Sequence, residues 1–161
     1  MPNWCFNTAE VTHKNPAMLK MFSDSFDNST LFSNFFPLPE GRDDWYEWAI
    51  EEWGTKWDAR KSDSQFVEET STLHIDFETA WSPPIAAYKK FTDLGFNINS
   101  TFHESGMCFI GTWKSDDGEE YYEYDFSDEN WRDDLPPDLI SMLESDYAFY
   151  LECHEEPEDE P

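Results

Sequence analysis

Apolar and polar residues alternate over several stretches of the chain, a period of two that is typical of half-buried β-strands. In the clearest stretch, Leu73, Ile75 and Phe77 alternate with polar neighbours, so one face of the predicted strand is apolar and the other is polar. Together these patterns predict four strands, over residues 5–13, 57–67, 72–79 and 96–102, of which the second has the least regular pattern.

Apolar residues spaced by three and four predict three helices between these strands. The first begins at Asn15-Pro16, where Asn can cap the helix and Pro can occupy its first position, and it runs to about Phe26. A Pro-containing stretch, residues 31–41, is predicted to be a loop. The second helix ends at Gly54, and one face of it carries Trp45, Trp48, Ala49 and Trp53. The third covers residues 85–94, after Ser82-Pro83-Pro84.

The dipeptide Asp117-Gly118 predicts a β-hairpin with a two-residue turn. That turn would pair residues whose numbers sum to 235. Three aromatic positions on the returning strand, Tyr122, Tyr124 and Phe126, would then face Trp113, Gly111 and Phe109. On the other face, Glu119, Glu123 and Asp125 would form a row toward water. The hairpin is therefore predicted to separate its aromatic residues from its acidic ones.

The last third of the chain continues with a short predicted helix after Leu135-Pro136-Pro137. Tyr147, Phe149 and Leu151 then alternate with other residues, which predicts an edge strand. Residues 152–161 hold six acids in ten positions and are predicted to be a disordered acidic tail. The domain prediction is a single domain over residues 1–151 followed by this tail.

Charge is concentrated in that last third. The 161 residues hold 36 acids and ten Lys plus Arg, a net charge of −26. Residues 1–114 carry 17 acids and nine bases, whereas residues 115–161 carry 19 acids and one base. Phosphates would be repelled, so direct binding to nucleic acid is not expected. Aromatic residues make up 18% of the chain, which predicts a folded core built from few, bulky side chains.

The sequence offers few signs of chemistry. Three widely spaced cysteines give neither a disulfide framework nor a zinc site, and the four histidines lack the spacing of a metal pair. No phosphate-binding loop or nucleophile motif is present. We therefore expect no cofactor, no metal and no enzymatic activity. No segment reads as a leader or a membrane span, so a soluble, cytoplasmic protein is expected.

Four sequence pieces, MPNWCFN, EWGTKWDA, FETAWSPP and FHESGMCFIGTW, resemble the YubB-type family of ferredoxin-like domains. That family occurs on enterobacterial plasmids, phages and related elements, and it has no established catalytic residues. The resemblance implies an α+β fold with a ferredoxin-like β-α-β-β-α-β core, which matches the predicted order of elements, with the hairpin and a C-terminal helix added. At Glu52 the chain departs from the Asn that is usual in the family motif.

Two surfaces are candidates for partner binding. The first is acidic and consists of Asp116, Asp117, Glu119, Glu123, Asp125, Asp128, Glu129, Asp133 and Asp134. It would present DNA-like negative charge to a basic host protein that handles nucleic acid, such as a restriction enzyme or a CRISPR effector. A merely solubilising acidic face is the other interpretation.

The second candidate surface is the family motif, Trp53, Lys56, Trp57 and Asp58. It could make the chain an interaction or scaffold domain that binds through tryptophans, with the acids only solubilising. The motif could equally be a structural corner between helix and strand, in which both tryptophans pack and Lys56 pairs with a carboxylate. Neither interpretation defines an oligomeric state.

Overall fold

The computed structural model describes residues 2–155 and contains two compact units. The N-terminal unit spans residues 1–121 and the C-terminal unit spans residues 122–161. The boundary falls inside the last strand, and each unit is described by itself below.

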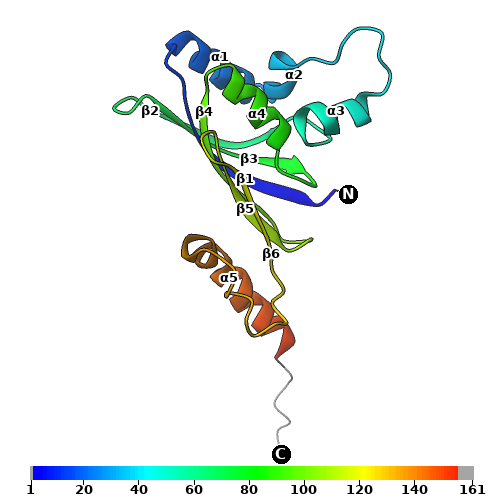
Figure 1. Ribbon diagram of the computed structural model, residues 1–161, viewed down its shortest axis with the longest axis vertical. Helices are drawn as coiled ribbons and strands as arrows, with labels where there is room; N and C mark the ends of the chain where they lie inside the picture. The colour runs from blue at the N-terminus through cyan, green and yellow to red at the C-terminus, as the bar shows by residue number, and fades with distance from the viewer. Residues whose placement is uncertain (1, 156–161) are drawn as a thin grey trace, which may run out of the picture. The chain divides into compact units, whose positions relative to one another are not determined.

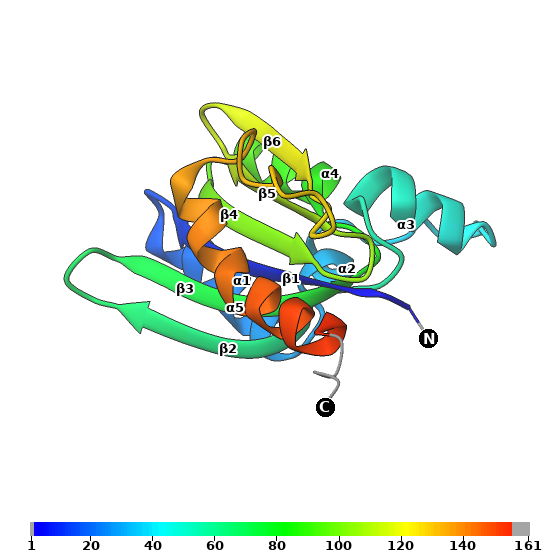
Figure 2. The same cartoon turned by 90° about the horizontal axis from the view of Figure 1, so that it is seen from below.

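A six-stranded sheet forms the framework of the N-terminal unit. Its strands run in the order β2-β3-β1-β4-β5-β6, and Figure 2 shows them side by side in this order. The pairs β1–β3, β1–β4, β2–β3 and β4–β5 are antiparallel. The bounds are β1 Trp4–Thr12, β2 Arg60–Val67, β3 Thr72–Ala80, β4 Asn97–Glu104, β5 Phe109–Lys114 and β6 Gly118–Glu123.

Helices cover one face of this sheet (Figure 1). They are α1 Pro16–Asp27, α2 Leu31–Phe35 and α4 Ile85–Asp93, whereas α3 Trp45–Trp53 packs against α4 at the side of the sheet (Figure 2). The side chain of Asn15 accepts a hydrogen bond from Ala17 N at 3.0 Å and caps α1, as the sequence predicted. The prediction of a loop over residues 31–41 was wrong at its start, because the carboxylate of Asp58 accepts bonds from Phe32 N and Ser33 N and stabilises the short helix α2.

Phenylalanine rings make up most of the core between the helices and the sheet. The ring centroid of Phe91 lies 4.9–5.5 Å from the rings of Phe22, Phe35, Phe36 and Phe96. From the sheet, β3 contributes Leu73, Ile75 and Phe77, all 2% exposed. This burial confirms the alternation seen in the sequence and fixes which face of β3 meets the helices.

Apart from α2 and α3, which are inserted before β2, the order β1-α1-β2-β3-α4-β4 is the split β-α-β arrangement of the ferredoxin-like fold. In the sheet, β3 lies between β1 and β2, and β1 lies between β3 and β4. The connection through α1 therefore passes over β3, and the connection through α4 passes over β1. The predicted fold class is confirmed: an α+β ferredoxin-like core with an added hairpin and a C-terminal helix.

The hairpin turn differs from the predicted one. The N–H of Asp117 donates to the carbonyl of Lys114 at 3.1 Å, so a three-residue loop over residues 115–117 joins β5 to β6. Gly118 follows with a φ of +86°, a left-handed conformation that completes this kind of turn. Strand β6 therefore begins earlier in the sequence than the predicted turn implied. Gly111 of β5 lies close to this strand, because a Cβ atom on it would be 2.1 Å from the carbonyl oxygen of Glu120.

The predicted separation of aromatic and acidic faces was also wrong. Because β6 ends at Glu123, neither Tyr124 nor Phe126 is part of the strand. Glu119, Tyr121 and Glu123 are spaced by two along β6 and therefore lie on the same face. Tyr121 is 47% exposed, and its ring centroid lies 5.2 Å from that of Phe109. Acidic and aromatic side chains thus share one face of β6.

A single long helix dominates the C-terminal unit. Helix α5 spans Pro137–His154, so the predicted edge strand over residues 147–151 was wrong. The reason is a stripe at helical spacing, which continues well past the predicted end of the helix through Leu139, Leu143, Tyr147, Tyr150 and His154. Of the predicted acidic tail, residues 152–154 are helical, Glu155 is the C-cap of α5, and residues 156–161 lie outside the described residues.

Candidate partner-binding surfaces

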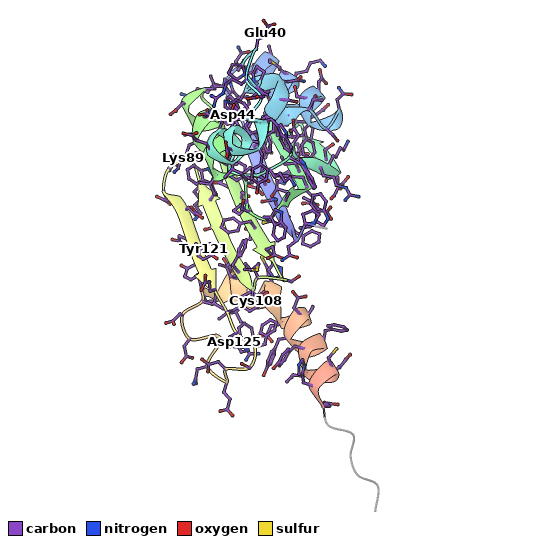
Figure 3. The ribbon with its side chains drawn as sticks, turned by 90° about the vertical axis from the view of Figure 1, so that its right-hand side faces the viewer. Glu40, Asp44, Lys89, Cys108, Tyr121 and Asp125 are labelled. Atoms are coloured by element: carbon purple, nitrogen blue, oxygen red, sulfur yellow. The ribbon has the colours of Figure 1, made fainter. Side chains whose placement is uncertain are left out.

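All nine acids of the predicted acidic surface are exposed. Three of them, Asp116, Asp117 and Glu119, lie in the N-terminal unit at the turn of the β5–β6 hairpin and just after it. The other six belong to the C-terminal unit: Glu123, Asp125, Asp128, Glu129, Asp133 and Asp134. The structure thus divides the predicted surface between the two units, with the larger share on the loop that precedes α5. Figure 3 labels Asp125 on this loop.

That loop, residues 124–136, folds around an aromatic cluster. The ring of Phe126 lies 4.7 Å from Tyr124, 5.0 Å from Trp131 and 5.3 Å from Tyr147 of α5. Tyr124 and Trp131 are 6% and 5% exposed. Contacts of this kind stabilise a packed cluster beyond simple area burial. The acids between these rings are therefore carried on an ordered scaffold.

Arg132 is the only Lys or Arg after residue 114, and its charge is used inside the C-terminal unit. Its guanidinium donates two hydrogen bonds of 2.9 Å to the carboxylate of Glu144. The same group lies over the rings of Trp131 at 4.2 Å and Tyr147 at 4.8 Å. The hydrogen bonds from Arg132 lower the pKa of Glu144. This clamp joins the loop to α5 and removes one acid from the surface charge.

Two of the loop acids also fix local turns. The carboxylate of Asp125 accepts hydrogen bonds from Ser127 N at 2.9 Å and Ser127 Oγ at 2.6 Å, which lower its pKa. Asp128 accepts one from Asn130 N at 2.9 Å. Short polar side chains commonly close turns in this way. These carboxylates stay exposed while their positions are held.

The family motif at the end of α3 divides into an internal and an external half. Trp53 donates from its indole to Phe36 O at 3.0 Å and packs against Trp48 and Phe32, so it lies half-buried against the core. Asp58 caps α2. Glu52, the departure from the family motif, pairs with Lys90 of α4. The structural-corner interpretation therefore describes this half of the motif.

The same corner joins the two motif pieces WGTKWDA and TAWSPP. Thr55 Oγ1 donates to Ala80 O at 3.0 Å, and Ser82 Oγ donates to Gly54 O at 2.6 Å. Gly54 has a φ of +83°, and a Cβ atom there would lie 3.1 Å from two backbone nitrogens of α4. The motif pieces consequently hold α3, β3 and α4 together, which is a structural role.

Lys56 and Trp57 form the external half. The amine of Lys56 lies over the rings of Trp57 at 4.6 Å and Tyr46 at 5.4 Å, instead of in the carboxylate pair that the corner interpretation expected. Trp57 also lies 6.0 Å from Trp4. With Trp45 and Tyr46 each 47% exposed, these five residues form an exposed aromatic patch.

Sequence reasoning missed part of this patch. Helical periodicity grouped Trp45 with the buried Trp48, yet Trp45 is the first residue of α3 and is 47% exposed. Tyr46 carried no signal of its own. Only the position of both residues next to a long loop could have indicated exposure.

The residues closest to acid–base or nucleophile chemistry have structural roles. Glu104 is 2% exposed, and its carboxylate accepts hydrogen bonds from Gly106 N at 2.8 Å and Met107 N at 2.7 Å. Burial raises the pKa of the Cys5 thiol to about 12, so its thiolate is scarce at neutral pH. Within residues 2–155 no three His, Cys, Asp or Glu side chains gather as metal ligands, and no helix has the length and apolar character to cross a bilayer.

The fold and these surfaces define a ferredoxin-like α+β domain extended by an acidic C-terminal unit. A scan against family models matches residues 52–136, slightly more than half of the chain, to the family described as the ferredoxin-like domain in Api92-like protein. The chain belongs to this family. Searches of curated proteins and of solved structures found no significant match.

Proposed function

We propose that the chain is a non-catalytic binding protein whose acidic C-terminal unit docks on a basic surface of a host protein that handles nucleic acid. One observation carries this proposal: the single arginine of the unit is bound by Glu144 and two aromatic rings. Residues 122–155 hold eleven acids against this one base, so the folded scaffold carries a large excess of negative charge.

Electrostatics supports this partner class. An ordered array of carboxylates produces a negative potential that attracts and orients a cationic surface, and like-charged surfaces are repelled. A groove that binds nucleic acid is lined with Lys and Arg to neutralise phosphates, so it is complementary to such an array. Solubility alone would require far less charge than this unit carries.

We also propose that the chain lies within the YubB-type group of ferredoxin-like domains of plasmids and phages, and that it acts in the host cytoplasm. The four sequence pieces given above support this placement. A mobile element benefits from blocking restriction enzymes, CRISPR effectors or similar defence proteins, and these all bind nucleic acid. The proposed activity is therefore inhibition by occupation of a DNA- or RNA-binding groove.

The test is a pair of charge-reversal variants with equal net charge. The first variant changes Glu129, Asp133 and Asp134 to Lys in the acidic loop. The second changes Glu40, Glu68 and Asp93 to Lys in the N-terminal unit; all six residues are exposed. After capture of partners from an enterobacterial lysate, titration of the purified partner gives affinities over a salt series.

We expect the acidic-loop variant to lose at least a hundredfold in affinity at low salt, because like charges placed across an interface cost several kcal/mol. The control variant should bind almost as tightly as the unchanged chain. Equal losses in both variants would show that net charge alone matters and would refute a specific acidic surface.

A second candidate function is protein binding through the aromatic patch of Trp4, Trp45, Tyr46, Lys56 and Trp57. Its support is the exposure of three large aromatic residues around one lysine, because aromatic side chains are enriched at the centres of interfaces. Changing Trp57, which is 38% exposed, to Ala should then abolish capture while leaving the circular dichroism spectrum unchanged. Retained capture would dismiss this candidate.

A further inference from the structure

A cavity of about 490 Å³ lies within the N-terminal unit, between α1 and the β2–β3 hairpin. Both views of the ribbon place the start of α1 on the same side of the unit as the β2–β3 turn (Figures 1 and 2). This volume is in the range of small-molecule sites. Its apolar walls come from Pro16, Leu19, Phe66 and Leu73.

The polar wall of this cavity is cationic although the chain is strongly acidic. Lys14 and Lys20 both line it, together with a single carboxylate, that of Asp24. Lys20 pairs with Asp24 at 2.8 Å, whereas the amine of Lys14 has no ion pair within the described part of the chain. Two of only ten Lys plus Arg residues thus lie at one cavity, which inverts the local sign of charge.

Helix α1 adds to this positive potential. It starts at Pro16, beside Lys14, and its first turn contains no acidic residue. The side chain that caps the helix start is that of Asn15, which is neutral, so the partial positive charge there still favours an anion nearby. His13 is held in position beside the cavity: its Nδ1 accepts a hydrogen bond from Asn15 N at 2.9 Å, and its Nε2 lies 2.8 Å from Leu94 O.

The opposite wall shows two features that burial and backbone energy alone do not favour. Phe66 is 51% exposed although it lines an apolar cavity. Ser71, which closes the β2–β3 turn at the cavity, has a φ of +50°, a strained conformation for a residue other than glycine. Strain of this kind is frequent at ligand sites. An apolar ligand would cover Phe66.

We propose that this cavity binds a small amphipathic anion, with its carboxylate or phosphate at Lys14 and the start of α1. The apolar body of the ligand lies along Leu19, Phe66 and Leu73. The head group places a negative charge beside Lys14 and the helix start. The apolar body of the ligand removes the exposed ring of Phe66 from water. This site is independent of the acidic surface of the C-terminal unit.

The test compares four probes with ten-carbon chains and one eight-carbon probe on the full chain by calorimetry, below their micelle concentrations. Decanoate and decyl phosphate should bind, and these two arms identify the preferred head group. Decanol should bind at least tenfold more weakly, because an ion–dipole or ion-pair contact is lost. Octanoate should bind up to about fifteenfold more weakly than decanoate, since it lacks two buried methylene groups. Decyltrimethylammonium is the critical control, because non-specific attraction to a chain of charge −26 would favour it.

Two lysine variants locate the site. Lys14→Gln should weaken decanoate binding about tenfold, whereas Lys89→Gln, at an exposed position on α4 outside the cavity, should leave it unchanged. Phe66→Ala should weaken all apolar probes alike. Any one of three results would overturn the proposal. Decyltrimethylammonium could bind as tightly as decanoate, or the two lysine variants could have equal effects. The third such result is a set of NMR shifts confined to residues away from Leu19 and Leu73.

Discussion

The two units of the chain carry similar net charge on very different amounts of structure. The N-terminal unit has 21 acids and nine bases over 121 residues, while the C-terminal unit has 15 acids and one base over 40 residues. In the larger unit, phenylalanines from helices and sheet form a deep core. In the smaller unit, one helix and one loop pack through Tyr, Trp and Leu residues and the single Phe126 at the centre of the ring cluster.

This difference shows how a small unit can carry a high density of charge. Tyrosine and tryptophan rings each bury a large apolar area, so a few of them suffice for a packed cluster. Arg132 stacks on two of these rings and binds Glu144, so one cation connects loop and helix. The remaining acids then repel one another, which opposes compaction. A cationic partner would relieve that repulsion.

The largest effect should come from core truncations that affect one unit each. Phe91→Ala removes a ring that contacts four other phenylalanines and should cost about 3–5 kcal/mol in the free energy of unfolding. Leu143→Ala should cost about 2–5 kcal/mol, because Leu143 is fully buried. Hydrogen exchange should be accelerated mainly in the sheet for the first variant and mainly in α5 for the second.

Thiol chemistry gives a second comparison. Cys5 lies in the core with a pKa of about 12, so roughly one molecule in ten thousand is ionised at this site at pH 8. Cys153 on α5 is exposed. Iodoacetamide at pH 8, followed by mass spectrometry, should label Cys153 at least a thousandfold faster than Cys5. Comparable rates in the native protein would contradict the described burial of Cys5.

The hairpin offers a matched pair of glycine variants. Gly111→Ala should destabilise the N-terminal unit by about 1–3 kcal/mol or more, because the new methyl group would overlap the Glu120 carbonyl and the ring of Phe102. Gly118→Ala should cost about 1–2 kcal/mol, since its φ is +86° but open space surrounds it. Urea denaturation measures both. If Gly111→Ala left the free energy of unfolding unchanged, the described position of β6 next to Gly111 would be wrong.

The smallest predicted effect concerns the clamp of the C-terminal unit. Arg132→Ala should raise the pKa of Glu144 toward its ordinary value, whereas Arg42→Ala should not affect it. Because the folded state lowers this pKa, the pair stabilises the fold above the unfolded pKa of Glu144, and the contribution disappears as pH falls through the folded value. An NMR titration of the Glu144 carboxyl measures the shift.

Much of the fold could be predicted from the sequence, because local signals and tertiary structure agree there. Leu73, Ile75 and Phe77 alternate in the sequence and are buried together, and Asn15-Pro16 begins a helix in both descriptions. The hairpin turn could not be predicted, since Asp117-Gly118 suits both a two-residue turn and the longer loop that the Asp117–Lys114 bond closes.

The candidate surfaces were predictable only in part. Exposure of the acids follows from the cost of burying charge, so residues such as Asp133 and Asp134 could be identified directly. The role of Arg132 could not, because Glu144 lies twelve positions away and the aromatic partners belong to different segments. The two halves of the family motif, Trp53 inside and Trp57 outside, differ only through tertiary contacts.

The most direct measurement for the proposed function is competition between the chain and nucleic acid for one captured partner. Duplex DNA or RNA carrying a fluorescent label is bound to the purified partner, and the chain is added in increasing amounts at two salt concentrations. The account predicts complete displacement of the nucleic acid by the unchanged chain and at least hundredfold weaker displacement by the variant with Lys at positions 129, 133 and 134. Formation of a ternary complex, in which partner, nucleic acid and chain bind together, would contradict it.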